Sequence, residues 1–218
     1  MAAAGLLDGK RATTHWYSVG ELRDAYPSVV QVADRRFVVD GGVATTTGIT
    51  ASMPMMLTLI EAIAGRDKAE AVAGDLGLAA WDARHDSRAF GFTRPFAVTV
   101  LGNVLAFWKR DELGIELSRG IDEVSLALVA DAWSRTYRSR AVTFASSADA
   151  VETRNGVRII PDKITRAWTA EKLLPDLGER KPAEALDQAL LAISARYGDR
   201  TADVVAMQLE YPWSGGVR

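Results

Sequence analysis

Apolar side chains recur at intervals of three and four residues between positions 53 and 64, and this spacing predicts a helix with one apolar face. We expect Ser52 to cap the N-terminus of this helix and Gly65 to end it. A second helix is predicted to follow directly over residues 67–76 and to end at Gly77. The first third of the chain therefore contains a pair of consecutive helices.

A β-hairpin is predicted just before this helix pair. Two β-rich segments, residues 36–39 and 43–46, flank the triplet Asp40-Gly41-Gly42, which supplies the positive φ angles that a tight hairpin turn needs. The other strands are expected at residues 11–16, 114–117 and 141–145, with a second hairpin over 151–160 that turns at Asn155-Gly156.

Four further helical segments complete the pattern. They cover residues 96–110, 122–137 and 182–197, with a last helix that starts at Asp199 or Thr201. The segment 122–137 is apolar on most sides, which predicts burial on more than one side. Strands and helices thus share the chain, and we expect an α/β fold with a partly parallel sheet flanked by helices.

Composition excludes several classes of protein. The 218 residues include no cysteine, so disulfides, thiolate zinc sites and cysteine nucleophiles are excluded from this sequence. With 48% hydrophobic residues, 25% charged residues and a net charge of −2, the chain has ordinary globular composition. The uncharged run 41–60 is too rich in threonine, serine and glycine for a membrane span. We therefore expect a cytoplasmic protein that does not contact membranes.

Direct nucleic-acid binding is not expected either. Residues 131–166 carry seven basic residues against four acidic ones, but no exposed aromatic residues alternate with them, so a solvated face is favoured over a nucleic-acid surface. The two last helices leave a helix-turn-helix arrangement open, although their mixed charges give no basic recognition face.

Few residues of the chain suggest chemistry. His15 lies at the end of a predicted strand, where sites gather in α/β sheets, and a hydrogen-bonded structural histidine is the alternative. His85 is expected in a loop near a cap. Asp122 and Glu123 are adjacent and point about a hundred degrees apart on a helix, so they cannot form a facing pair; a solvated first turn is the simpler interpretation. No metal or other cofactor is expected.

Residues 2–16, AAAGLLDGKRATTHW, resemble the segment that follows the nucleophile elbow in the ThiJ/PfpI family, and the resemblance continues to about residue 92. This family has the class I glutamine amidotransferase-like, flavodoxin-like fold. Gly120-Ile121-Asp122-Glu123 then resembles the strand-end motif of the family's N-terminal half, and residues 151–162 resemble a hairpin of that half. The two halves thus appear in permuted order, or Met1 lies inside a longer domain.

The resemblance implies a division of the chain into three parts. Residues 1–95 match the C-terminal half of a family domain, residues 96–164 match the N-terminal half, and residues 165–218 form a linker and a C-terminal helical region. Incomplete sheets expose their edges, so we expect a homo-oligomer.

The resemblance also leaves two functions open, because the reactive cysteine of the family would precede Met1 and Ser125 replaces a carboxylate that often contacts it. One is a non-catalytic domain that senses a small-molecule ligand or associates with a transcriptional regulator. The other is a fragment of a cysteine-dependent amidase, hydratase or glyoxalase-like deglycase, in which His15 would be catalytic. The residues expected to bind a ligand are Thr14, His15, Gly48, Asp122 and Glu123.

Overall fold

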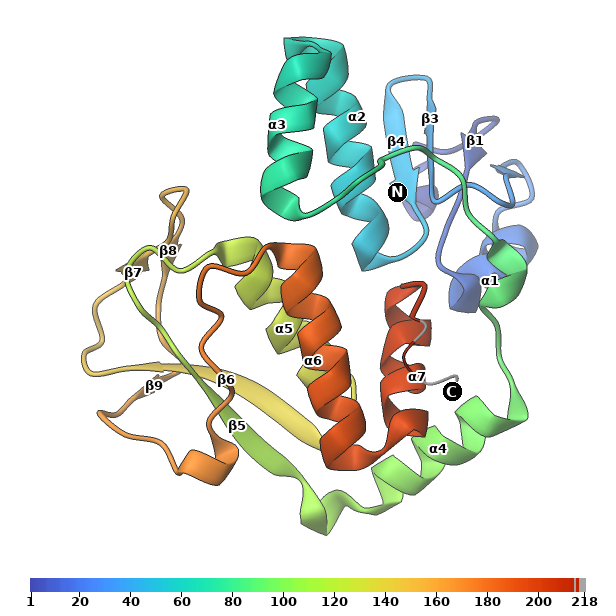
Figure 1. Cartoon of the computed structure of the whole chain (residues 1–218). Coiled ribbons are helices and arrows are strands. Elements are labelled where there is room, and N and C mark those ends of the chain that lie inside the picture. The colour runs from blue at the N-terminus through green and yellow to red at the C-terminus, as the bar shows by residue number, and fades with distance from the viewer. Residues whose placement is uncertain (214, 216–218) are drawn as a thin grey trace. The chain divides into compact units, whose positions relative to one another are not determined.

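A computed structural model describes residues 1–213 and 215, and the chain divides into two compact units. The first unit comprises Met1–Thr93 together with Met207–Pro212, and the second contains Arg94–Ala206. The last helix therefore begins in the second unit and ends in the first. Figure 1 shows both units, each with strands and helices, so the chain has the expected α/β fold.

The first unit contains two small sheets and three α-helices (Figure 1). Its strands and helices, in chain order, are β1 (Arg11–Ala12), α1 (Val19–Ala25), β2 (Val30–Gln31), β3 (Phe37–Asp40), β4 (Val43–Thr46), α2 (Ser52–Ala64) and α3 (Arg66–Leu76). Strands β1 and β2 are parallel, whereas β3 and β4 form the predicted antiparallel hairpin, in which Phe37 pairs with Thr46. Single 3-10 turns lie at Ala2–Ala4, Trp16–Ser18, Ile49–Ala51 and Ser87–Ala89.

Two local expectations for this unit are corrected. The strand predicted over residues 11–16 ends at Ala12, because the chain turns into a 3-10 helix at Trp16. Ser52 does not cap α2, since the 3-10 turn Ile49–Ala51 runs directly into that helix and places Ser52 inside it. Gly65 ends α2, as predicted, with a φ of 86° that suits glycine.

The second unit is built on a parallel three-stranded sheet in the order β5-β6-β9. Its elements are α4 (Arg94–Leu105), β5 (Asp111–Glu116), α5 (Glu123–Ser134), β6 (Ser139–Ala145), β7 (Val151–Glu152), β8 (Arg158–Ile159), β9 (Lys163–Ile164), α6 (Pro182–Tyr197) and the first part of α7 (Asp199–Leu209). Strands β7 and β8 form the predicted second hairpin. Helix α5 packs against β6 and against α6, and this packing buries Leu126, Trp133, Leu186, Leu190 and Ile193.

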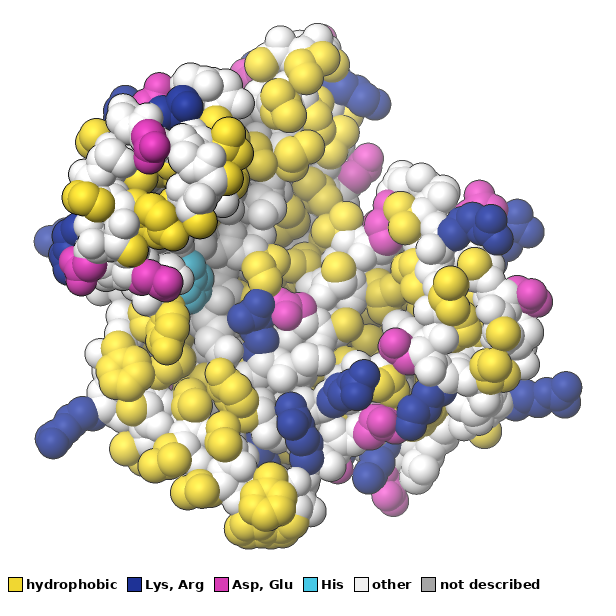
Figure 2. Space-filling model, turned by 180° about the vertical axis from the view of Figure 1, so that it is seen from behind, with side chains coloured by type: hydrophobic (Ala, Val, Ile, Leu, Met, Phe, Trp, Pro, Cys, Tyr) yellow, Lys and Arg dark blue, Asp and Glu magenta, His cyan; other side chains and the backbone are white. Residues whose placement is uncertain are grey.

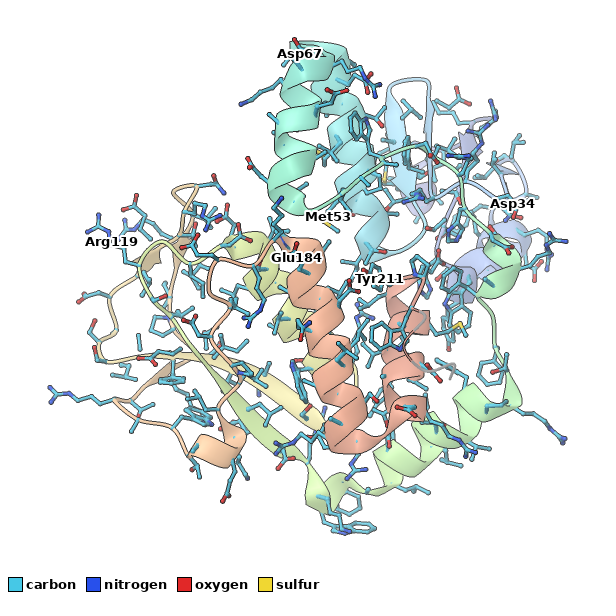
Figure 3. All side chains as sticks on the ribbon, in the orientation of Figure 1. Asp34, Met53, Asp67, Arg119, Glu184 and Tyr211 are labelled. Carbon is cyan, nitrogen blue, oxygen red and sulfur yellow. The ribbon has the colours of Figure 1, made fainter. Side chains whose placement is uncertain are left out.

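The helix pair α2–α3 recurs as α6–α7. Aligning Gly65 with Gly198 places identical residues at Leu57 and Leu190, Ile60 and Ile193, Ala62 and Ala195, Ala69 and Ala202, Val72 and Val205, Ala73 and Ala206, and Leu76 and Leu209. The backbone at the joint is also the same, with φ and ψ of 86° and 166° at Gly65 and of 89° and 155° at Gly198. The chain thus contains an internal repeat of a helix–glycine–helix motif, which Figure 3 marks with Met53 and Asp67 on the first pair and Glu184 on the second.

Candidate functional site

The first unit brings both histidines of the chain to one buried carboxylate. Glu210 follows the end of α7, and its side chain is 2% exposed. Its Oε2 lies 3.1 Å from His85 Nε2, and its Oε1 lies 4.0 Å from His15 Nε2. We call His15, His85 and Glu210 the histidine–glutamate cluster; its three members come from segments far apart in the sequence.

His15 owes its position to the 3-10 turn that follows β1. The backbone N–H of Tyr17 donates to His15 Nδ1 at 3.2 Å, so the imidazole caps this turn. A neutral imidazole that accepts at Nδ1 carries its proton on Nε2. That nitrogen lies 3.1 Å from the backbone carbonyl of Gln208, which accepts the hydrogen bond from its N–H. Both ring nitrogens therefore have backbone partners.

Glu210 is held by more than the histidines. The backbone N–H of Trp16 donates to Glu210 Oε1 at 2.7 Å, and the indole Nε1 of Trp16 donates to the carbonyl of Met207 at 2.8 Å. Glu210 has a φ of 49°, a left-handed conformation that costs a side chain other than glycine about 1 kcal/mol. Its carboxylate contacts hold this conformation in place.

His85 enters the cluster from the loop after α3. Its ring stacks on Phe90, with centroids 5.1 Å apart and an interplanar angle of 4°, and its side chain is 10% exposed. Figure 2 shows histidine as one small area on the face that it presents. The ring thus faces a carboxylate at one nitrogen and stacks on an aromatic side chain.

Gly48 lies against the same end of α7. A Cβ at this position would come within 2.6 Å of the Leu209 carbonyl oxygen and within 2.8 Å of Glu210 Cβ, so only glycine allows this approach. Two residues before His15, Thr13 is buried and donates its backbone N–H to Thr45 Oγ1 at 3.0 Å. The first unit therefore places His15 and Gly48 against the segment 208–210, and Thr14 precedes His15 directly in the chain.

Asp122 and Glu123 belong to the second unit, at the start of α5. Asp122 Oδ1 accepts the backbone N–H of Ser125 at 2.7 Å, which is an N-cap. Asn155 donates to Glu123 Oε1 at 2.8 Å. Burial raises the pKa of the Glu123 carboxyl, but the hydrogen bonds from Asn155, from backbone and from Thr153 outweigh burial, so its pKa lies below the ordinary value. Both carboxylates thus have partners in the fold.

Of the three cluster residues, the sequence predicts a functional role for His15, gives no signal for Glu210 in its own segment, and predicts only a loop position for His85. One signal was available in the internal repeat, where Glu210 occupies the position that Gly77 has in the first pair. An acid at a helix C-terminus opposes the helix dipole, so it is unexpected there without partners. Among the residues that the structure describes, no three His, Asp or Glu side chains are placed to hold a metal ion, and no helix is long and apolar enough to cross a membrane.

Comparison with known proteins relates about a third of the chain to two kinds of protein. The HTH-type transcriptional regulator CdhR of Pseudomonas aeruginosa is 45% identical over 60 residues, which are 28% of this chain and 18% of that protein. The HTH-type transcriptional regulator GlxA of Rhizobium meliloti is 42% identical over 72 residues, 33% of this chain and 22% of that protein. Isonitrile hydratase of Pseudomonas putida is 45% identical over 74 residues, 33% of this chain and 30% of that enzyme.

These matches support the ThiJ/PfpI resemblance over about a third of the chain. The matched region spans less than a third of the length of each of these relatives. No protein-family model matches the sequence.

Proposed function

We propose that this protein recognises a small molecule without thiol catalysis, as a sensing domain related to those of transcriptional regulators. Two similar proteins are HTH-type transcriptional regulators, and the sequence contains no cysteine that could serve as a nucleophile. The proposal includes Thr14, His15 and Gly48 as ligand-contacting residues. Asp122 and Glu123 are kept as candidates for the same role in the second unit.

The bonding of His15 is the observation that carries this proposal. A general base needs a free lone pair within reach of the proton that it removes. The Nδ1 lone pair of His15 accepts from Tyr17, and Nε2 faces the carbonyl of Gln208. The imidazole is thus held as a fixed hydrogen-bonding group at the edge of a buried carboxylate, an arrangement that suits recognition better than proton transfer.

Two histidines make the proposal simple to test. In a sample labelled with ¹⁵N-histidine, the imidazole signals belong to only two residues, and His85→Gln assigns them. The probes are a panel of small carboxylates, amides and amines added singly to the full chain. We expect one class to shift the His15 signals in a saturable manner, and His15→Gln to weaken that binding at least tenfold. The absence of any saturable shift would contradict ligand sensing at this site.

A second candidate function is favoured by the 45% identity to isonitrile hydratase over 74 residues. In this alternative, His15 serves an enzyme whose cysteine comes from sequence outside these 218 residues. The test is isonitrile hydration by the chain produced together with the sequence that flanks it in its gene, followed as formation of the N-substituted formamide. We expect no turnover above background; turnover that His15→Ala abolishes would favour the enzyme and refute the sensing domain.

A further inference from the structure

Helix α2 carries an apolar stripe that solvent reaches. Its members are spaced four, three, four and three residues apart, which places them on one side of the helix; they are Ile49, Met53, Met56, Ile60 and Ile63. Met56 is 46% exposed and Ile63 is 76% exposed. Figure 2 shows hydrophobic side chains over the α2–α3 pair. We call these five residues the α2 stripe.

In the internal repeat, the positions on α6 that are equivalent to the α2 stripe are buried. The α6 positions that align with the first four members are Pro182, Leu186, Ala189 and Ile193, and all four are buried. Helix α5 packs along α6 and accounts for this burial. The same motif therefore has a covering helix in its second occurrence.

Helix α2 has no such cover in its own unit. Helix α3 is the main helix that packs on α2, as α7 follows α6 in the repeat. The remaining helix of that unit, α1, has seven residues, none of them buried. Helix α5 itself is already occupied, since Leu126, Leu128, Val129, Ala132 and Trp133 are buried within the second unit.

The absence of charged residues on α2 indicates which kind of helix can pack on the α2 stripe. Helix α2 has no charged residue from Ser52 to Ile60, and α5, which covers the equivalent helix, has none from Val124 to Ala130. A charged partner would lose hydration against such a surface without gaining a counter-charge. An uncharged helix rich in leucine, valine and alanine loses nothing and removes apolar area from water.

We propose that the α2 stripe is a docking site for an apolar helix of the α5 type supplied by another protein chain. The partner helix lies along α2 as α5 lies along α6. Met56 and Ile60 are at the centre of the contact, because they align with the buried Ala189 and Ile193.

The experiment measures binding of a fluorescent peptide with the sequence of residues 121–135, IDEVSLALVADAWSR, to the full chain by anisotropy. We expect saturable binding that Met56→Lys weakens at least tenfold, since the lysine places a charge in the centre of the stripe. Leu191→Lys is the matched control: Leu191 is 47% exposed on α6 and aligns with Thr58, outside the stripe. A peptide with Leu126 and Val129 both replaced by Asp is the control for the probe.

Each outcome decides for or against the proposal. Circular dichroism verifies that both lysine variants fold, which their exposed positions favour. Absent binding, or equal binding by the wild type and Met56→Lys, would overturn the docking site. Sedimentation tests whether a second copy of this chain occupies the stripe instead. A wild-type dimer that Met56→Lys converts to a monomer, without saturable peptide binding, would identify the stripe as a contact between copies. That result would refute the α5-type partner.

Discussion

Replacing Glu210 separates the two opposing contributions of this residue to stability. Its carboxylate accepts the Trp16 N–H at 2.7 Å and faces His85 at 3.1 Å, while its backbone is in the left-handed region. Alanine removes the carboxylate and keeps the strained backbone. Glycine removes the carboxylate and also relieves the strain, as Gly77 does at the aligned position with a φ of 78°.

The expected magnitudes follow from these contacts. A hydrogen bond to a charged group contributes about 1.5–3 kcal/mol, and leaving the Trp16 N–H without its acceptor adds to the loss. We therefore expect Glu210→Ala to lower the free energy of unfolding by about 3 kcal/mol. Relief of the left-handed backbone returns about 1 kcal/mol, so Glu210→Gly should lose about 2 kcal/mol.

The assay is urea unfolding followed by tryptophan fluorescence, with midpoints converted through the slope of each transition. Glu21→Ala is the control for loss of one acidic side chain, because Glu21 is exposed on α1, and it should stay within about 0.5 kcal/mol of the wild type. A Glu210→Gly variant as stable as the wild type would refute the reasoning, since the carboxylate would then contribute no more than its strain costs.

Three further outcomes are expected. Gly48→Ala should destabilise the chain by about 1–3 kcal/mol in urea unfolding, because its Cβ would meet the Leu209 carbonyl oxygen, whereas Gly74→Ala on α3 meets nothing within 4 Å and should be neutral or slightly stabilising. Gly114→Ala should cost a similar amount, since its Cβ would enter the Trp168 ring, and near-ultraviolet dichroism should change with it. Burial raises the pKa of Asp111, but its hydrogen-bonded hydroxyl and guanidinium partners outweigh burial and lower it. Stability from Asp111 is thus present above pH about 4 and lost as pH falls through its lower folded pKa, so Asp111→Asn should flatten the acid limb of a stability–pH curve; an unchanged limb would contradict this.

The partners of Asp111 show why this prediction required the structure. Tyr197 Oη donates to Asp111 Oδ2 at 2.7 Å, and Arg196 Nη2 lies 3.1 Å from the same oxygen. These residues are separated by more than eighty positions. No periodicity links the first residue of β5 to the last residues of α6, so such contacts appear only when the fold is known.

Local signals predicted local structure well. The hairpin of β3 and β4 follows from Asp40-Gly41-Gly42, and both glycines have positive φ angles in the structure. The ends of α2 and α3 follow from Gly65 and Gly77 for the same reason. The failures at Ser52 and at the end of β1 both involve 3-10 turns, which are too short to leave a periodic pattern of their own.

The candidate site was predictable only in part, because its members are distant in sequence. His15 stood out through its resemblance to a family segment, but the carbonyl that its Nε2 faces and the carboxylate that accepts from the adjacent Trp16 N–H lie more than 190 residues away. Burial of Glu210 depends on the docking of residues 207–212 onto the first unit. The sequence signals at a helix end are local and therefore do not indicate which distant segment packs against it.

The internal repeat connects the two proposals. The two helix pairs share their joint and their buried small residues, yet each has gained a feature that the other lacks. In the first pair, the helix end is closed by Gly77, which is exposed, and the long face of α2 is open. In the second pair, that face is covered by α5, and the helix end carries Glu210, buried against both histidines. The repeated core is the same, so the two pairs differ in the residue at the helix end and in the neighbour along the face of the first helix. The helix end of the second pair is expected to meet a ligand, and the open face of the first pair a partner helix.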